Sequence, residues 1–356
     1  MATIGLKKLR HSYMANPSEP ADWALKEVDI DWSDGGAYAL LGPSGCGKTT
    51  LLNIISGLVT PSEGKILFDG ADVTHLPPDR RNIAQVFQFP VIYDTMTVYE
   101  NLAFPLRNRH VPAAKVDARV REISEMLELD AMIDQRAAGL SPDAKQKISM
   151  GRGLVRDDVN VIMFDEPLTV IDPHLKWKLR SKLKELHQRV QVTMIYVTHD
   201  QTEALTFADQ VVVMEEGEVV QIGTPVDLFE RPTHTFVGHF IGSPGMNVLP
   251  CEVRDGRARF ADTEVAVENG VRGLRGGERL EIGVRPEFIT FADAGVPAEI
   301  VKVADTGRNQ LVEARADGQR IHVLVPEGES VPADRTHLVF DPAKTRVYAD
   351  GWLVEG

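Results

Sequence analysis

A glycine-rich stretch near the N-terminus carries the clearest chemistry in this sequence. Residues 42–50 follow the apolar run 37–41 and precede the apolar residues 51–55. A strand, a glycine-rich turn and a helix start in this order bind a nucleoside triphosphate, because glycines let successive backbone N–H groups face one anion. Lys48 would reach the β- and γ-phosphates, and the Thr49 hydroxyl would ligate Mg²⁺. The expected nucleotide-binding residues are Gly42, Pro43, Ser44, Gly45, Cys46, Gly47, Lys48, Thr49 and Thr50.

Two adjacent acids follow a second apolar run. Residues 161–164 are all apolar and lead directly into Asp165 and Glu166. Such a run predicts a central strand of a parallel sheet, whose carboxyl end is where charged groups can emerge beside a nucleotide. Asp165 is then placed to hold Mg²⁺, directly or through water, and Glu166 to polarise the attacking water. The alternative is a pair of solvated acids or a helix cap.

Three further side chains are candidates for the site, and two of them stand at expected strand ends. Gln88 follows the short strand 83–87, and the strand-like run 193–197 ends at Thr198 and His199. Gln88 is either a surface residue or a ligand of Mg²⁺ or water, and His199 is either structural or a contact of the γ-phosphate. Tyr13 lies in an N-terminal β-like region, where it is either a half-buried strand residue or a partner that stacks on adenine.

The pattern of elements predicts an α/β unit followed by an all-β unit. Strands alternate with helical segments from residue 37 to about 215, which indicates a mainly parallel sheet. Asp172 and Pro173 start one helix, and Asp200 with Glu203 resembles a capping box for another. After two short helical stretches within 225–241, alternating strands with Gly and Pro turns predict a small barrel.

Composition narrows the function classes. A chain of 356 residues exceeds the usual size of one hydrophobic core, so we expect two domains. The formal net charge of −13 argues against nucleic acid as a partner. No apolar run is long enough to span a bilayer, the N-terminus lacks the apolar core of a secretory signal, and Cys46 and Cys251 form no disulfide framework. A reducing cytoplasm fits these features best.

These motifs together resemble the ATP-binding subunits of ABC transporters, specifically the bacterial carbohydrate-uptake type. Residues 42–49 resemble the Walker A loop, residues 161–166 resemble the Walker B strand with its catalytic glutamate, and Ile171-Asp172 resembles the end of the D-loop. Gln88 is similar to the Q-loop glutamine, His199 to the switch histidine and Tyr13 to the A-loop aromatic, although the loop after Tyr13 is longer than usual.

The resemblance implies a P-loop ABC ATPase domain over residues 1–240, with a helical subdomain at about 89–155. It also implies an OB-like (TOBE) regulatory β domain over residues 241–356. The implied cofactors are ATP and Mg²⁺, with Glu166, His199 and Lys48 as catalytic groups and Thr49, Gln88 and Asp165 at the metal. The implied partners are two transmembrane permease subunits and, through the complex, a solute-binding protein. Such a subunit is peripheral to the cytoplasmic face of the plasma membrane.

One motif departs from the family. The signature normally reads Leu-Ser-Gly-Gly-Gln and contacts nucleotide held by the other ATPase subunit, but residues 140–144 read Leu-Ser-Pro-Asp-Ala. Ser141 is still expected to contact the nucleotide of the partner subunit. Pro142, however, removes one N–H donor, and Asp143 adds a carboxylate near the polyphosphate. We therefore expect a heterodimer with a second ATPase subunit that has a complete signature. The alternative is a homodimer that tolerates the variant with Asp143 turned outward.

The transported solute is inferred from two stretches of the sequence. Residues 86–96 and 165–174 resemble the paired ATPases of bacterial glycerol importers, which favours glycerol or a related polyol, with a di- or oligosaccharide next. No residue of such a subunit is expected to touch the solute. A mainly ATP-binding regulatory subunit stays open as an alternative. A soluble ABC-type ATPase of DNA repair or translation predicts duplicated cassettes or basic surfaces, which this acidic single-cassette sequence lacks.

Overall fold

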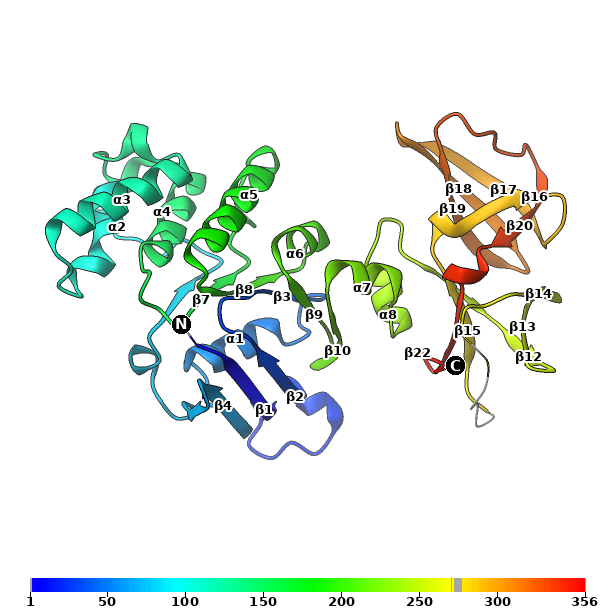
Figure 1. Cartoon of the computed structure of the whole chain (residues 1–356), viewed down its shortest axis with the longest axis horizontal. Coiled ribbons are helices and arrows are strands. Elements are labelled where there is room, and N and C mark those ends of the chain that lie inside the picture. Colours follow the sequence, from blue (N-terminus) through cyan, green and yellow to red (C-terminus); the bar gives the residue numbers. More distant parts are fainter. Residues whose placement is uncertain (1, 270, 272–276, 356) are drawn as a thin grey trace. The chain divides into compact units, whose positions relative to one another are not determined.

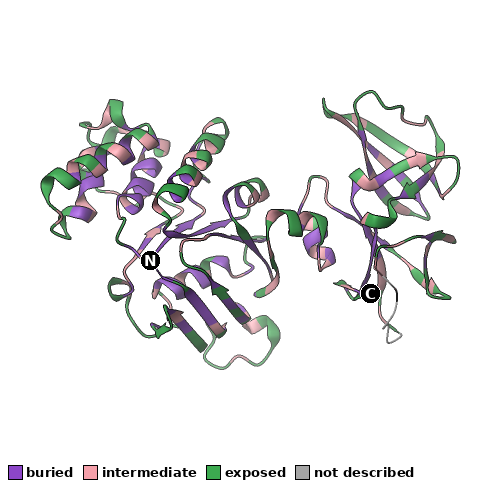
Figure 2. Ribbon diagram, viewed as in Figure 1, coloured by how far each residue is buried: buried purple, intermediate pink, exposed green. Residues whose placement is uncertain are grey.

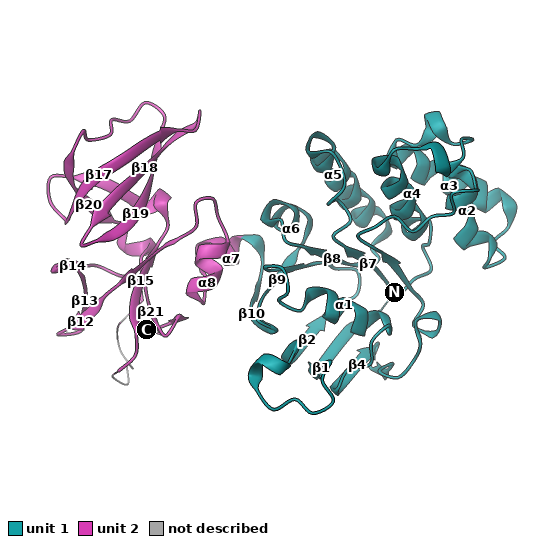
Figure 3. Cartoon of the chain, turned by 180° about the vertical axis from the view of Figure 1, so that it is seen from behind, with its two compact units in different colours: residues 1–225 teal, residues 226–356 magenta. Residues whose placement is uncertain are grey.

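A computed structural model describes residues 2–269, 271 and 277–355. The chain forms two compact units, residues 1–225 and residues 226–356 (Figure 3). Each has its own hydrophobic core, as expected for a chain of this length. Among the described residues, no helix has both the length and the apolar character needed to cross a bilayer.

The first unit is built on a six-stranded sheet in the order β10-β9-β3-β8-β7-β6. The strands pair in parallel except at the β9–β10 edge, where they are antiparallel. Their bounds are β3 Ala37–Leu41, β6 Ile83–Val86, β7 Val161–Asp165, β8 Thr193–Thr198, β9 Gln210–Glu215 and β10 Glu218–Gly223. Strands β3, β7 and β8 are buried along their full length (Figure 2), which explains their unbroken apolar runs.

A second, antiparallel sheet packs over one face of this core. Its order is β2-β1-β4-β5, with bounds β1 Ile4–His11, β2 Leu25–Trp32, β4 Glu63–Phe68 and β5 Ala71–Asp72. Helix α1, Lys48–Ser56, lies between the two sheets (Figure 1). Its buried Leu51, Leu52, Ile54 and Ile55 belong to the same apolar cluster as residues of both sheets, so the core holds the start of α1 against the end of β3.

Helices cover the rest of the first unit. They are α2 Val98–Arg107, α3 Ala113–Leu127, α4 Pro142–Leu154, α5 Pro173–Val190 and α6 Gln201–Phe207. Short 3-10 turns occupy Pro20–Asp22, Pro78–Arg80, Asp130–Met132 and Ala137–Gly139. Helix α3 buries an apolar stripe of Val116, Val120, Ile123 and Leu127. Helices α2 to α4 fall within the range 89–155.

The second unit is mainly β. Its strands are β11 Asn247–Pro250, β12 Glu252–Arg254, β13 Arg257–Phe260, β14 Thr263–Val265, β15 Leu280–Val284, β16 Ile289–Ala292, β17 Val296–Asp305, β18 Asn309–Ala316, β19 Gln319–Pro326, β20 Arg335–Phe340, β21 Arg346–Ala349 and β22 Trp352–Leu353. They form three antiparallel sheets around one apolar cluster, with 3-10 turns at Pro286–Phe288 and Pro342–Lys344. The predicted fold class, α/β followed by a small all-β module, is confirmed.

The two units divide at Pro225/Val226, earlier than the boundary at residue 240 expected from the sequence. The intervening helices α7 Pro225–Glu230 and α8 Thr235–Phe240 pack on the β unit. The buried Arg285 guanidinium donates to backbone carbonyls of Leu228, Phe229, Gly238 and Ile241. Because the guanidinium ties both helices to β15, they cluster with the second unit.

Candidate functional site

The loop between β3 and α1 has the backbone needed to surround an anion. Gly45 and Gly47 have φ angles of 84° and 101°, which disfavour any residue with a side chain. A Cβ at Gly47 would lie 2.6 Å from the Ala24 carbonyl oxygen, and one at Gly42 would lie 2.2 Å from that of Met214. The loop is therefore closely packed from behind, and Pro43, Ser44 and Gly45 are exposed on its outer side.

Lys48 is folded into this loop. Its side chain is buried, and Nζ donates to the carbonyl oxygens of Gly42 and Pro43, both at 2.8 Å. The Cys46 sulfur lies 3.7 Å from the same ammonium. The loop thus holds a positive charge beside the first turn of α1, where N–H groups lack intrahelical partners.

The structure brings Thr49 and Asp165 together although they are far apart in the sequence. The Thr49 hydroxyl donates to Asp165 Oδ1 at 3.3 Å. Burial raises the pKa of the Asp165 carboxyl, and the Thr49 hydrogen bond opposes this effect. A buried carboxylate beside a hydroxyl is a suitable pair of ligands for Mg²⁺, which prefers oxygen and few protein ligands.

Glu166 is the shared partner of three other side chains. Its Oε2 lies 3.1 Å from His199 Nδ1 and accepts from the amide of Gln88 at 3.4 Å and the hydroxyl of Thr169 at 3.3 Å. Its backbone N–H donates to the Val197 carbonyl oxygen at 2.9 Å. The adjacent ends of β6, β7 and β8 thus place Gln88, Glu166 and His199 at one point, as parallel strands with polar ends predict.

Glu166 also adopts an uncommon backbone conformation, with φ of 47°. A non-glycine residue there costs on the order of 1–3 kcal/mol and persists only where surrounding contacts enforce it. The conformation turns the chain directly after β7, so that Asp165 and Glu166 serve different groups: Asp165 faces Thr49, and Glu166 faces His199.

Tyr13 lies beside the start of α1. The residue is 67% exposed, its hydroxyl is 3.2 Å from the Thr50 hydroxyl, and the His11 ring packs edge-on at a centroid distance of 4.6 Å. An exposed aromatic ring fixed beside the first turn of α1 is available for stacking on a base. The half-buried strand tyrosine considered as the alternative does not match this exposure.

Residues 140–144 lead into a capped helix. Ser141 is the N-cap of α4, and its hydroxyl accepts from the Ala144 N–H at 3.3 Å. Pro142 occupies the first helical position, where its missing N–H costs no helical hydrogen bond. Asp143 Oδ2 lies 3.4 Å from the buried Lys147 ammonium, one turn further along α4. The added carboxylate therefore has a cation beside it.

Gln146 is a structural contact of the site that the sequence did not single out. Its fully buried amide donates to the carbonyl oxygens of Phe87 and Pro167, at 3.2 and 3.0 Å. These two residues adjoin Gln88 and Glu166, so α4 is tied to the segment that carries both. The sequence pattern does not distinguish this glutamine, because Lys147 and Ser149 of the same helix are also polar and buried.

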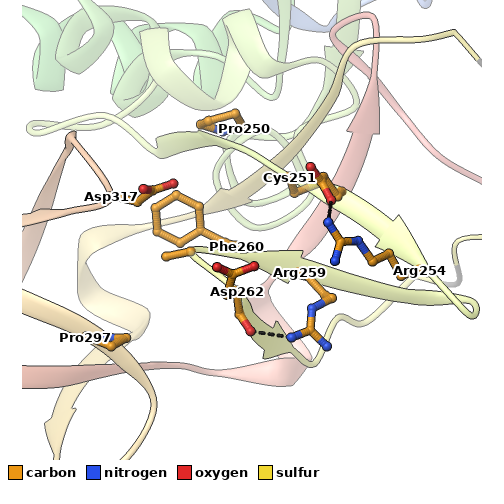
Figure 4. Close-up of a pocket in the computed structure, with 10 residues that line it drawn as sticks. Pro250, Cys251, Arg254, Arg259, Phe260, Asp262, Pro297 and Asp317 are labelled. Carbon is orange, nitrogen blue, oxygen red and sulfur yellow. Dashed lines mark hydrogen bonds and ion pairs between the residues drawn. The ribbon is translucent and has the colours of Figure 1, made fainter.

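A separate cleft of about 400 Å³ lies in the second unit (Figure 4). Its two guanidinium groups are engaged within the chain, since Arg254 pairs with Glu252 at 2.6 Å and Arg259 donates to the Asp262 carbonyl oxygen. None of the predicted site residues line it. It is not the nucleotide site.

Comparison with known proteins identifies the family. Residues 25–169 match the family described as ABC transporter, and residues 242–289 match the MalK OB fold domain. The chain is 39% identical to the sn-glycerol-3-phosphate import ATP-binding protein UgpC of Bordetella avium, over 88% of this chain and 86% of that protein. The corresponding protein of Burkholderia pseudomallei is also 39% identical, over 96% and 98%. An uncharacterized ABC transporter ATP-binding protein, y4oS of Sinorhizobium fredii, is 41% identical over 89% of both chains.

Two solved structures agree with these matches. CbiO1 from Clostridium perfringens, part of an ABC transporter complex, has a TM-score of 0.57 and 27% identity, covering 64% of this chain and 90% of its own. The ATP-binding cassette MJ0796, solved as a dimer bound to ADP and Pi after hydrolysis, has a TM-score of 0.55 and 28% identity, covering 62% and 98%.

The chain therefore belongs to the ATP-binding proteins of ABC transporters, and it is an ATPase that binds ATP. With its MalK-type OB domain, it belongs among the importer ATPases that include the sn-glycerol-3-phosphate proteins, in which hydrolysis is coupled to import.

Proposed function

We propose that this chain powers the uptake of sn-glycerol 3-phosphate, or of glycerol or a related polyol. The names of the relatives support the phosphate ester, which refines the glycerol expected from the sequence. A di- or oligosaccharide remains the alternative, because the 41% identical relative carries no named solute. The observation that carries the hydrolytic mechanism is the meeting of Gln88, Glu166 and His199 at one carboxylate oxygen.

In the proposed mechanism, Glu166 orients and polarises the attacking water, because its carboxylate stands at the strand ends beside the phosphate loop. Lys48 and His199 stabilise charge on the transferring phosphoryl group, and for this Lys48 exchanges its carbonyl partners for phosphate oxygens. The loop amides hold the phosphates, and Tyr13 stacks on the adenine. Bound Mg²⁺ supplies charge neutralisation at the phosphates, with Thr49, Asp165 and Gln88 as the residues that hold it.

Replacing Glu166 by Gln tests this proposal. The change keeps the shape of the side chain but removes the base, so turnover should fall by about 10²- to 10⁴-fold while ATP binding is retained. Steady-state hydrolysis by the assembled transporter and nucleotide binding by the same complex measure the two effects. The control is Glu185→Gln, the same change on the exposed face of α5, which should leave both unchanged.

The same variants test the solute. In cells that depend on this chain, uptake of labelled sn-glycerol 3-phosphate should stop with Glu166→Gln and persist with Glu185→Gln. Uptake that continues while hydrolysis is lost would show that a different solute is carried. Wild-type hydrolysis in Glu166→Gln would instead remove Glu166 from the base role.

The proposed assembly has two ATPase subunits, two permease subunits and a solute-binding protein, with this chain peripheral to the cytoplasmic face of the membrane. We keep the heterodimer as the working hypothesis, because Pro142 lacks the N–H that the family's glycine supplies. The carboxylate of Asp143 was the second reason to expect a heterodimer. It is a weaker reason in the structure, because Lys147 of α4 partly compensates its charge. ATPase activity of the purified chain, with and without a second ATPase subunit, separates the heterodimer from a homodimer.

A further inference from the structure

A buried carboxylate lies beneath the loop that carries His199. Glu203, on α6, is 3% exposed. Its Oε2 accepts from the Thr198 hydroxyl at 2.8 Å and from the Tyr196 hydroxyl at 3.1 Å, and its Oε1 lies 3.5 Å from the Lys176 ammonium. Removing a carboxylate from water is costly unless it is paired and hydrogen-bonded, so these partners make Glu203 a rigid part of the fold.

The Thr198 hydroxyl makes two hydrogen bonds around His199. It donates to Glu203, and it accepts from the backbone N–H of Asp200 at 3.0 Å. The chain is therefore fixed on both sides of the histidine. The His199 side chain itself is 53% exposed, and its ring contacts Glu166. Its position depends on the backbone rather than on packing around the ring.

Lys176 links this carboxylate to a second functional segment. Lys176 lies in the first turn of α5, and its backbone N–H donates to the carbonyl oxygen of Asp172 at 3.1 Å. Asp172 is the residue that resembles the end of the D-loop. One carboxylate thus contacts the strand end before His199 and the helix that follows Asp172.

We propose that Thr198 and Glu203 are positioning residues for hydrolysis, which hold the His199 imidazole against Glu166 through the backbone at residues 198–200. The inference rests on the roles proposed above for Glu166 and His199. Neither Thr198 nor Glu203 is proposed to touch the nucleotide. Removing either side chain should therefore lower kcat with little change in the KM for ATP.

The experiment compares three variants in the assembled transporter. Thr198→Val removes the hydroxyl at constant shape and should lower kcat by about 10- to 100-fold, because a small displacement of a reacting group is costly. Thr198→Ser keeps the hydroxyl and should restore most of the rate. The control is Thr193→Val at the other end of β8, where a fully buried threonine hydroxyl accepts from the Gly35 N–H. It should reduce thermal stability while keeping kcat within about twofold of wild type.

A double-mutant cycle tests whether Thr198 acts through His199. In a His199→Ala background, Thr198→Val should have little further effect on kcat. Equal losses in both backgrounds, a slow Thr198→Ser variant, or an equal loss of kcat in Thr193→Val would each overturn the inference. The proposed role of His199 fails separately, if His199→Ala alone hydrolyses ATP at the wild-type rate.

Discussion

Asp165 shows how a single functional residue can reduce the stability of the fold that carries it. The residue is 9% exposed at the end of β7, and burial raises the pKa of its carboxyl. The folded state therefore binds the Asp165 proton more tightly than the unfolded state does. Between the ordinary pKa of an aspartate and the raised pKa in the folded state, the free energy of unfolding falls as the pH rises, because the unfolded state releases this proton first. Above the folded-state pKa the loss of stability stays constant. A bound cation would relieve it.

We predict that Asp165→Asn makes the nucleotide-free chain more stable. The amide removes the buried charge and can keep the Thr49 hydrogen bond, so the thermal midpoint should rise at neutral pH by about 2–4 °C, the shift that ~1 kcal/mol produces in a domain of the size of the first unit. The difference from wild type should shrink as the pH falls toward 4, because Asp165 then becomes protonated. Thermal unfolding without nucleotide at several pH values measures this.

The same variant should lose the Mg²⁺-dependent gain in ATP affinity, since a carboxylate ligand is gone. Asp157→Asn, a matched change at an exposed position, should alter neither property. If Asp165→Asn is less stable than wild type at neutral pH, burial of the charge is not the dominant effect at this position.

At the scale of elements, strand ends were predictable and side-chain partners were not. The apolar runs 37–41 and 161–164 lie in the strands β3 and β7, because central parallel strands are apolar on both faces. By contrast, Asp200 and Glu203 have the spacing of a capping box, yet only Asp200 caps α6. Glu203 turns inward to Thr198 and Tyr196, and local spacing alone does not reveal those tertiary partners.

A prediction at the scale of elements concerns the N-terminus of α4 and its effect on ATP hydrolysis. If the altered signature disables the ATP site that it completes, the purified chain alone should hydrolyse ATP slowly, because both sites of its dimer would contain the variant. Restoring both glycines with Pro142→Gly and Asp143→Gly should then increase that rate, because one N–H donor returns and one carboxylate leaves. The single variants apportion the two effects, and Asp143→Gly should contribute the smaller part, since Lys147 already compensates the charge.

The control is Asp94→Gly, which removes an exposed carboxylate that lies outside α4 and pairs with Lys145 of α4. It should not increase hydrolysis. Strong hydrolysis by the unmodified purified chain would contradict the heterodimer hypothesis and favour the homodimer.

At the scale of the whole molecule, Arg285 ties the helices α7 and α8 to the β unit. Arg285 is 3% exposed, and burial lowers its pKa to about 10, so it stays charged at neutral pH. Its guanidinium also stacks over the Phe229 ring at 4.0 Å. Composition marks the glycines at residues 242 and 245, but it does not show which backbone carbonyls a distant arginine will reach.

We predict that Arg285→Met destabilises the second unit alone. The thioether keeps much of the apolar packing but leaves buried carbonyl oxygens of α7 and α8 without a donor, a cost of about 1–3 kcal/mol for each oxygen that water does not reach. Thermal unfolding should show two transitions, of which Mg-ATP raises only the one that belongs to the nucleotide-binding unit. Arg285→Met should lower the other, whereas Arg279→Met, at an arginine whose side chain is 71% exposed, should shift neither by more than about 0.5 kcal/mol. A single transition that Mg-ATP raises and Arg285→Met lowers would mean that the two units unfold as one.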